Sequence, residues 1–339
     1  MSISKIFFIC ALLIHSGLSA QYQIKELSAQ KGVSIRALSV PTEKVVWASG
    51  SKGMVAKSTN EGVTFEWLQV KGYEKRDFRA IHAWNDQEAI IVAVASPAII
   101  LKTYDGGASW NKVYENTDTS MFLDAIHFSD QNNGTVIGDP IAGHLFFLTT
   151  KNKGASWDEL PNSYFKTKLN NGEAFFASSN SNIVNIGKEI LFVTGGLTSR
   201  LWKEGIAEAL PILQGSSSTG ANSIAVSPNG KIIVIVGGDF SNDKLANQNI
   251  VGYQKQWSKK IQKWDLLPMS NPNGYKSCVE FLDNDRLITC GTSGVDVSKN
   301  KGASWEKISD ASFHVVKKHP TKTGVYLAGS GGRICFVEL

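Results

Sequence analysis

Short runs of apolar residues recur along the whole chain and are separated by segments rich in Gly, Asn, Asp and Ser. Residues 90–95 and 232–236 are typical of these runs. Runs of this length between turn residues are typical of β-strands, whereas the periodicity of an amphipathic helix is missing from almost the whole length. The pattern therefore predicts an all-β fold.

The turns between the predicted strands contain a repeated eight-residue motif. Each copy reads hydroxyl, any, Asp or Asn, any, Gly, any, hydroxyl, aromatic, and the copies are residues 58–65, 103–110, 150–157 and 298–305. Their starts differ by 45, 47 and 148 residues, and 148 is three steps of about 49. A fixed period in this range indicates a propeller or a solenoid built from one supersecondary unit per repeat.

The residue types of this motif suit a tight turn. The Asp or Asn side chain can accept a hydrogen bond from the backbone two residues on, and Gly adopts a positive φ without strain. The hydroxyls can bond neighbouring amides, and the aromatic residue starts the next strand as an apolar anchor. We therefore predict a structural role for the motif and no catalytic one.

Alignment around the motif predicts seven units, each a four-stranded blade. Their first strands occupy residues 35–38, 78–81, 123–126, 175–178, 221–224, 276–279 and 313–316. Spread over residues 21–339, seven units have about 46 residues each, which is the size of a propeller blade. The fourth and fifth units lack the motif, and the fifth carries an insertion at residues 239–249. The predicted fold is a seven-bladed β-propeller in one domain, residues 21–339.

The two ends of the chain are predicted to close the ring. The last unit ends at Leu339 with three strands, and residues 21–27 read like the fourth strands at residues 156–160 and 304–308. We expect the N-terminal segment to become the outer strand of the seventh blade.

Residues 1–20 form a separate segment with one Lys, an apolar run at residues 6–14 and small residues before Gln21. This arrangement is typical of a secretory signal peptide and too short for a spanning helix. The sequence predicts cleavage after Ala20 and a secreted or periplasmic protein without a membrane span.

The remaining chain has 34 basic residues (35 minus Lys5) against 30 acidic ones, a net charge of +4. This excess is too small to indicate nucleic-acid binding. The chain has no dinucleotide fingerprint, haem-binding pair or iron–sulfur cysteine spacing, so no cofactor and no metal is expected. Cys278 and Cys290 fall in small-residue positions on adjacent strands, as buried thiols or as a disulfide.

Candidate binding residues occupy the variable position of each first strand, near the central axis. This position holds Arg36, Arg79, Asp124, Phe176, Asn222, Ser277 and His314. Lys276 is next to Ser277, and loops expected on the same face add Asp139, Arg200 and Asp239. Two interpretations are open: a binding site for a protein partner or a small anionic ligand, or a network in which Arg36 and Arg79 are neutralised by Asp124 and Asp139.

The chain resembles the Asp-box (BNR-type) propellers, and more closely the family related to the photosystem II stability and assembly factor. The resemblance rests on the four motifs and on residues 46–53, 138–140 and 237–239. Bacterial members of this family are often labelled oxidoreductases, which no motif of this chain supports. The resemblance implies a monomeric, non-catalytic interaction platform that holds a protein partner or an anionic ligand at the Arg-bearing mouth.

The alternative is a sialidase-like glycoside hydrolase, because sialidases share the motif. For this chain to be such an enzyme, Arg36, Arg79 and Arg200 would have to converge on the substrate carboxylate. Tyr275 would be the nucleophile, with Glu173 on the same face. The residues after Arg79 depart from the sialidase motif, and Tyr275 has no carboxylate close to it in the sequence.

Overall fold

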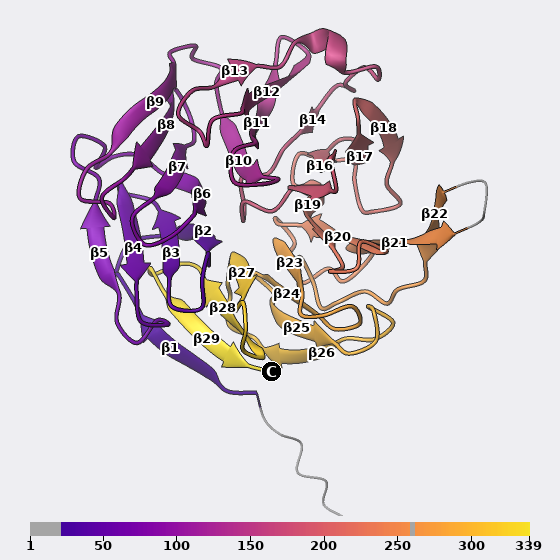
Figure 1. Ribbon diagram of the computed structural model, residues 1–339. Coiled ribbons are helices and arrows are strands. Elements are labelled where there is room, and N and C mark those ends of the chain that lie inside the picture. The colour runs from indigo at the N-terminus through magenta and orange to yellow at the C-terminus, as the bar shows by residue number, and fades with distance from the viewer. Residues whose placement is uncertain (1–21, 258–261) are drawn as a thin grey trace, which may run out of the picture.

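The computed structural model describes residues 22–257 and 262–339, and the predicted signal peptide, residues 1–20, lies outside the described residues. Over these residues the chain is all-β apart from one 3₁₀ turn, η1 (Asn162–Tyr164). The strands are arranged around a common centre (Figure 1). Within the described ranges, no helix has the length and apolar character needed to cross a membrane.

Five of the sheets have four antiparallel strands each. In chain order they are β2 (Ile35–Ser39), β3 (Val46–Gly50), β4 (Met54–Ser58), β5 (Glu66–Gln69); β6 (Phe78–Ala83), β7 (Ala89–Ala93), β8 (Ala98–Thr103), β9 (Asn111–Asn116); β10 (Leu123–Phe128), β11 (Gly134–Ile141), β12 (His144–Thr150), β13 (Asp158–Glu159); β23 (Cys278–Phe281), β24 (Leu287–Gly291), β25 (Gly294–Ser298), β26 (Glu306–Ser309); and β27 (Val315–Lys318), β28 (Gly324–Ala328), β29 (Ile334–Glu338), β1 (Ile24–Ser28). The sequence pattern therefore predicted the all-β class and the four-stranded sheets.

The fourth and fifth units share one larger sheet. Its strands are β14 (Glu173–Ala174), β15 (Ile183–Ile186), β16 (Glu189–Gly196), β17 (Arg200–Lys203), β18 (Ile206–Ala209), β19 (Thr219–Val226), β20 (Ile232–Asp239), β21 (Ile250–Trp257) and β22 (Gln262–Leu267). The pairing of Gly195 with Gly220 joins β16 to β19. The predicted first strand at residues 175–178 is wrong, because this segment is a loop between β14 and β15.

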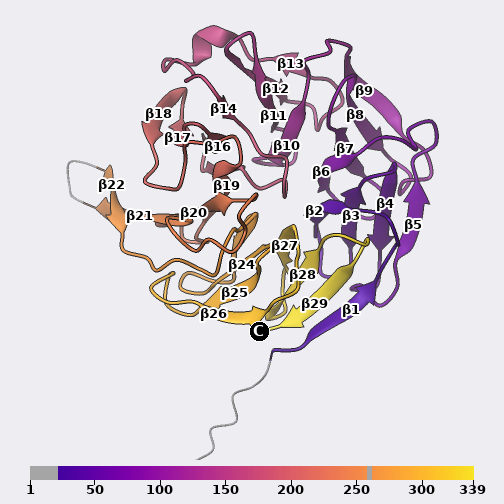
Figure 2. The same cartoon turned by 180° about the vertical axis from the view of Figure 1, so that it is seen from behind.

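The N-terminal strand lies beside the C-terminal one. Strand β1 pairs antiparallel with β29, with Ile24 opposite Val337 and Glu26 opposite Cys335. Both views of the molecule show β1 along the outer edge of this sheet (Figures 1 and 2). The segment that follows the predicted signal peptide is thus hydrogen-bonded to the other end of the chain.

The hydrophobic core lies between neighbouring sheets. The fully buried Trp47, for example, packs in one cluster with Phe78, Ile91 and Leu101 of the next sheet. Burial of one such large side chain contributes on the order of 2–3 kcal/mol. Each sheet therefore depends on its neighbours for stability.

The repeated motif forms the same set of hydrogen bonds in each of its four copies. In the second copy, the Thr103 hydroxyl donates to Asp105 Oδ1 (2.8 Å) and accepts from the Gly107 amide (2.9 Å), and the Ser109 amide donates to Asp105 Oδ1 (2.9 Å). The copies at residues 58–65, 150–157 and 298–305 repeat this arrangement. Gly107 has φ = 93°, which a side chain would strain.

Candidate functional site

A β-bulge in the inner strand of four units positions the predicted binding residues. In β2, Ile35 pairs with Gly50 and Ala37 with Ser49, so Arg36 is the unpaired extra residue. The register shifts in the same way around Arg79, Asp124 and Asn222. A bulge turns the side chain of the extra residue away from the regular alternation. The variable position seen in the sequence is therefore a bulge position in these four units.

The fourth unit fills the centre of the molecule with a loop. This segment, residues 175–182, is called the plug loop. Asn180 Nδ2 donates to the Ile81 carbonyl (3.0 Å), and Asn180 Oδ1 accepts from the Ile126 amide (2.8 Å). The Ser179 hydroxyl donates to the Ser277 carbonyl (2.6 Å). The plug loop is thus tied to the inner strands of the second and third units and, across the centre, to the sixth.

A cavity of about 430 Å³ is lined by three of the four bulge residues, Arg36, Arg79 and Asn222. Its lining takes residues from each of the seven predicted units: Arg36, Arg79, Phe122, Asp139, Phe175, Phe176, Ala177, Ser178, Asn222, Phe240, Tyr275, Ser277, Thr292 and His314. Ala177 and Ser178 belong to the plug loop. We call this the mouth cavity.

The two arginines of the mouth cavity differ in their partners. Arg79 forms an ion pair with Asp77 at 2.7 Å. The Arg36 side chain has no ion pair or hydrogen bond within the described residues, although burial and the charge of Arg79 lower its pKa. A guanidinium stays protonated under ordinary conditions. The mouth cavity therefore contains one cation without a bonded counter-ion.

The two aspartates lie in different environments. The Asp124 side chain is fully buried, and its carboxyl oxygens have no hydrogen-bond partner in the part of the chain that the structure describes. Burial and the nearby Asp139 carboxylate raise the pKa of Asp124 well above its usual value. Asp139 lines the cavity, accepts a hydrogen bond from the Phe175 amide (3.0 Å), and has a pKa raised by burial. Asp124 is thus poorly suited to neutralise Arg36 or Arg79.

His314 and Tyr275 are held by neutral partners. The ring nitrogen Nδ1 of His314 lies 2.8 Å from the Ile35 carbonyl, and burial lowers the pKa of His314 to about 4. The Tyr275 hydroxyl donates to Asn222 Oδ1 (2.8 Å), and burial raises its pKa. Both side chains are therefore neutral near pH 7, and neither offsets the charge of Arg36.

Four predicted site residues do not line the mouth cavity: the fully buried Asp124, and Arg200, Lys276 and Asp239. Arg200 forms a buried ion pair with Glu173, and Lys276 forms one with Asp296. Asp239 accepts a hydrogen bond from the Ser241 amide (2.9 Å) in a loop turn. The charges of Arg200 and Lys276 are compensated inside the units to which they belong.

The structure adds aromatic residues that the inner-strand alignment does not assign to the site. Phe122 precedes β10, Phe240 is the second residue of the insertion in the fifth unit, and Tyr275 precedes β23. In the sequence, only the presence of the insertion indicated that the region of Phe240 differs from the other units. Its position in the cavity follows from contacts between units, which a single sequence does not display.

The cysteines of the sixth unit lie directly opposite each other in the β-sheet. Cys278 pairs with Cys290 in register, and both are buried free thiols. Cys335 is also a free, buried thiol. For Cys278 and Cys290 the sequence left two alternatives, buried thiols or a disulfide, and the structure has the thiols.

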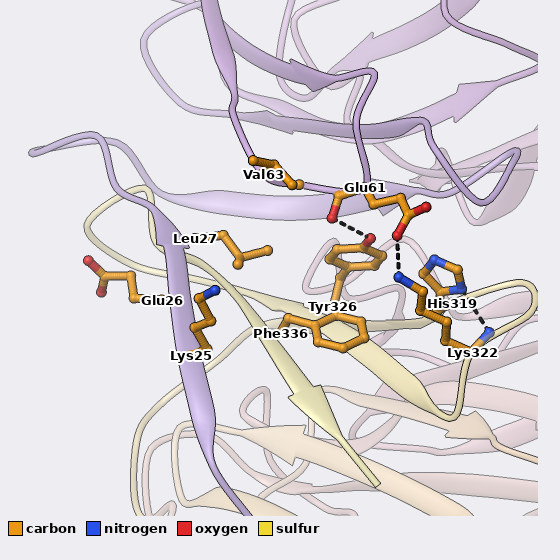
Figure 3. A pocket seen from close by; sticks show the side chains of 10 residues that line it. Lys25, Glu26, Leu27, Glu61, Val63, His319, Lys322, Tyr326 and Phe336 are labelled. Atoms are coloured by element: carbon orange, nitrogen blue, oxygen red, sulfur yellow. Dashed lines mark hydrogen bonds and ion pairs between the residues drawn. The ribbon is translucent and has the colours of Figure 1, made fainter.

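A second cavity of about 300 Å³ lies between β1 and the first copy of the motif (Figure 3). Glu61 of the motif forms an ion pair with Lys322, and the Tyr326 hydroxyl donates to the Glu61 carbonyl (3.1 Å). Leu27 and Phe336 add apolar surface. The polar groups on this wall bind one another, so the region functions as a seam between the chain ends and the first unit.

Comparison with solved structures supports the predicted resemblance at the level of the fold. YCF48 bound to a D1 peptide is 15% identical, with a TM-score of 0.62, covering 94% of this chain and 97% of that one. YCF48 from Cyanidioschyzon merolae is 15% identical, with a TM-score of 0.61, covering 94% and 98%. The GH74 enzyme of Niastella koreensis is 13% identical, with a TM-score of 0.62, covering 92% of this chain and 53% of that one.

No family model and no curated protein matches the sequence. The three structural similarities, all at low identity, show that the chain has the fold of a YCF48-like β-propeller. They leave the ligand to be argued from the mouth cavity.

Proposed function

We propose that the chain is a closed seven-bladed propeller in which β1 completes the seventh blade. The spacing of the motif and the pairing of β1 with β29 support this arrangement. Removing residues 22–28 should then expose the edge of β29 and lower the melting temperature by several degrees. An unchanged thermal transition would contradict closure by this strand.

We propose that this propeller is a non-catalytic interaction protein that binds an acidic segment of a protein partner in the mouth cavity. The observation that carries the proposal is the Arg36 guanidinium, which has no bonded counter-ion in a cavity it shares with Arg79. Planar guanidinium groups bind carboxylates in a bidentate manner. YCF48 has been solved with a D1 peptide, so a peptide ligand is compatible with this fold.

The test is binding of labelled Glu-containing peptides, and pull-down of partners from envelope extracts, with the parent and an Arg36→Ala/Arg79→Ala variant. Binding should fall at least tenfold, about 1.4 kcal/mol, while the thermal transition stays close to that of the parent. Arg286→Ala is the matched control, because Arg286 pairs with Asp283 on the surface, away from the cavity. Parent-like binding by the double variant would exclude the mouth cavity as the site.

The sialidase-like alternative is less well supported. It needs three arginines around one carboxylate, whereas Arg200 is paired with buried Glu173 and does not line the cavity. The Tyr275 hydroxyl bonds an amide oxygen instead of a carboxylate. Turnover of a sialoside that Tyr275→Phe abolishes would establish the enzyme instead.

We propose that residues 1–20 are removed on export and that the partner is met outside the cytoplasm. The apolar run and the small residues before Gln21 support this step. N-terminal sequencing of the protein recovered from the cell envelope or medium should begin at Gln21. Recovery of the uncleaved chain from the cytoplasm alone would refute it.

A further inference from the structure

One wall of the mouth cavity is aromatic, and two of its three rings come from the parts of the chain that depart most from the repeat. Phe176 belongs to the plug loop, and Phe240 belongs to the insertion of the fifth unit. Their ring centroids are 5.7 Å apart in an edge-to-face arrangement, and Phe240 lies 6.2 Å from Tyr275. The three rings form a continuous surface, which we call the aromatic wall.

Phe240 is the exposed member of this wall, with 47% of its surface accessible. Its backbone is nevertheless fixed: the Phe240 amide donates to the Ser218 carbonyl (3.1 Å), and the turn at Asp239 holds the next residue. A large apolar side chain that is held in place but left uncovered is available for a ligand. Holding it in advance reduces the entropy lost on binding.

The aromatic wall and the free arginine are close neighbours. Tyr275 packs against Phe240 and lies near enough to Arg36 for the two to interact electrostatically. Arg36, Phe240 and Tyr275 all line the same cavity. A ligand that contacts Arg36 through an anionic group therefore meets the aromatic wall with the atoms next to that group.

We propose that the mouth cavity selects a peptide in which a carboxylate is adjacent to an aromatic side chain. This inference rests on the proposed function and specifies its ligand. The carboxylate binds Arg36, and the aromatic ring packs against Phe240, where an aromatic pair contributes beyond simple burial. The plug loop supplies Ala177 and Ser178 to the lining of the same cavity.

The carboxylate can come from two sources, a Glu or Asp side chain or the end of a peptide chain. Four fluorescein-labelled hexapeptides distinguish them. Three have amidated C-termini and a central Phe-Glu, Ser-Glu or Phe-Gln pair in a Gly/Ser background. The fourth ends in Phe with a free carboxylate. Binding is measured by fluorescence anisotropy with the parent chain and three variants.

The parent should bind the Phe-Glu peptide at least fivefold more tightly than either the Ser-Glu or the Phe-Gln peptide. Phe240→Ala should weaken binding of the Phe-Glu peptide and so remove the preference for Phe-Glu over Ser-Glu. Leu245→Ala, in the same insertion and also exposed, is the control and should keep the preference. If the free-terminus peptide binds more tightly than Phe-Glu, the chain end is the source.

The outcomes separate the two proposals. If Phe-Glu and Ser-Glu bind equally and Phe240→Ala changes neither, the aromatic preference is wrong and the acidic ligand stands. If no peptide binds the parent, or if Arg36→Ala binds every peptide as the parent does, the proposed function is wrong and the preference fails with it.

Discussion

The second and the fourth units of the chain build the same kind of antiparallel sheet with different chemistry. In the second, the turn between β8 and β9 is the repeated motif, held by Thr103 and Asp105. In the fourth, a tight turn at Glu204 and Gly205 replaces the motif, and both residues have positive φ. There, Glu173 of β14 binds Arg200 and Trp202 of β17.

This difference separates structure from function. The motif is repeated because each unit must close the same hairpin, and the hydrogen bonds of its hydroxyl and Asp or Asn side chains that recur in every copy lie within the turn. The fourth unit, without the motif, also lacks a continuous inner strand and uses the plug loop to form one side of the mouth cavity. Two of the three rings of the aromatic wall, Phe176 and Phe240, belong to segments that depart from the repeat.

The largest effect should come from the buried ion pair of the fourth unit. Glu173→Gln keeps the size of the side chain but leaves Arg200, whose side chain is only 8% exposed, without a counter-charge. Removing one partner of a buried pair costs about 3–5 kcal/mol. Urea denaturation of the parent and the variant measures the loss.

Glu189→Gln is the matched control for this change. Glu189 of β16 pairs with Lys203 of β17 at 2.8 Å, so this pair also involves β17, but both side chains are 40% exposed. The expected cost is below about 1 kcal/mol, because solvent screens exposed pairs. Equal losses in the two variants would show that burial of the Glu173 pair does not matter.

The next effect tests the plug loop. Asn180 has φ = 56°, so Asn180→Gly removes the side chain without straining the backbone. The Ile81 carbonyl and the Ile126 amide would each lose a partner, at a total of roughly 2–3 kcal/mol. Glu204→Gly, also at positive φ but exposed, should be neutral. A neutral Asn180→Gly would mean that the plug loop is held by other contacts.

Hydrophobic patterning predicted most of the fold because strands and turns are local features. The positions of Arg36 and Arg79 in one cavity followed from aligning equivalent strands. The partners of Arg200 and Lys276 could not be predicted in this way, because Glu173 and Asp296 lie 27 and 20 residues away in other strands. The plug loop was also missed, since residues 175–178 have the apolar pattern of a strand, whereas the loop is held in place by Ser179 and Asn180.

A smaller effect is expected in the repeated motif. Thr103→Val keeps the shape of the side chain but removes the oxygen that accepts from the buried Gly107 amide. An unsatisfied buried amide costs about 1–2 kcal/mol. Ser109→Ala, at the exposed end of the same turn, should cost less. Peptide binding should be unchanged in both variants. Loss of binding without loss of stability would place function at the motif instead of the mouth.

The smallest change concerns Asp124, whose folded-state pKa lies above its unfolded value because the carboxyl is buried near Asp139. A raised carboxyl pKa contributes stability below the unfolded pKa, about 4, and this contribution is lost as the pH rises toward the folded pKa. Asp124→Asn removes this titration and keeps the shape. The variant should therefore gain stability relative to the parent by about 1 kcal/mol for a rise of one pH unit just above pH 4. The difference between the urea transitions of the parent and the variant reports the loss of the Asp124 carboxyl together with its interaction with Asp139. A constant difference from about pH 4 to about pH 7 would mean that Asp124 has an ordinary pKa and is free to neutralise Arg79.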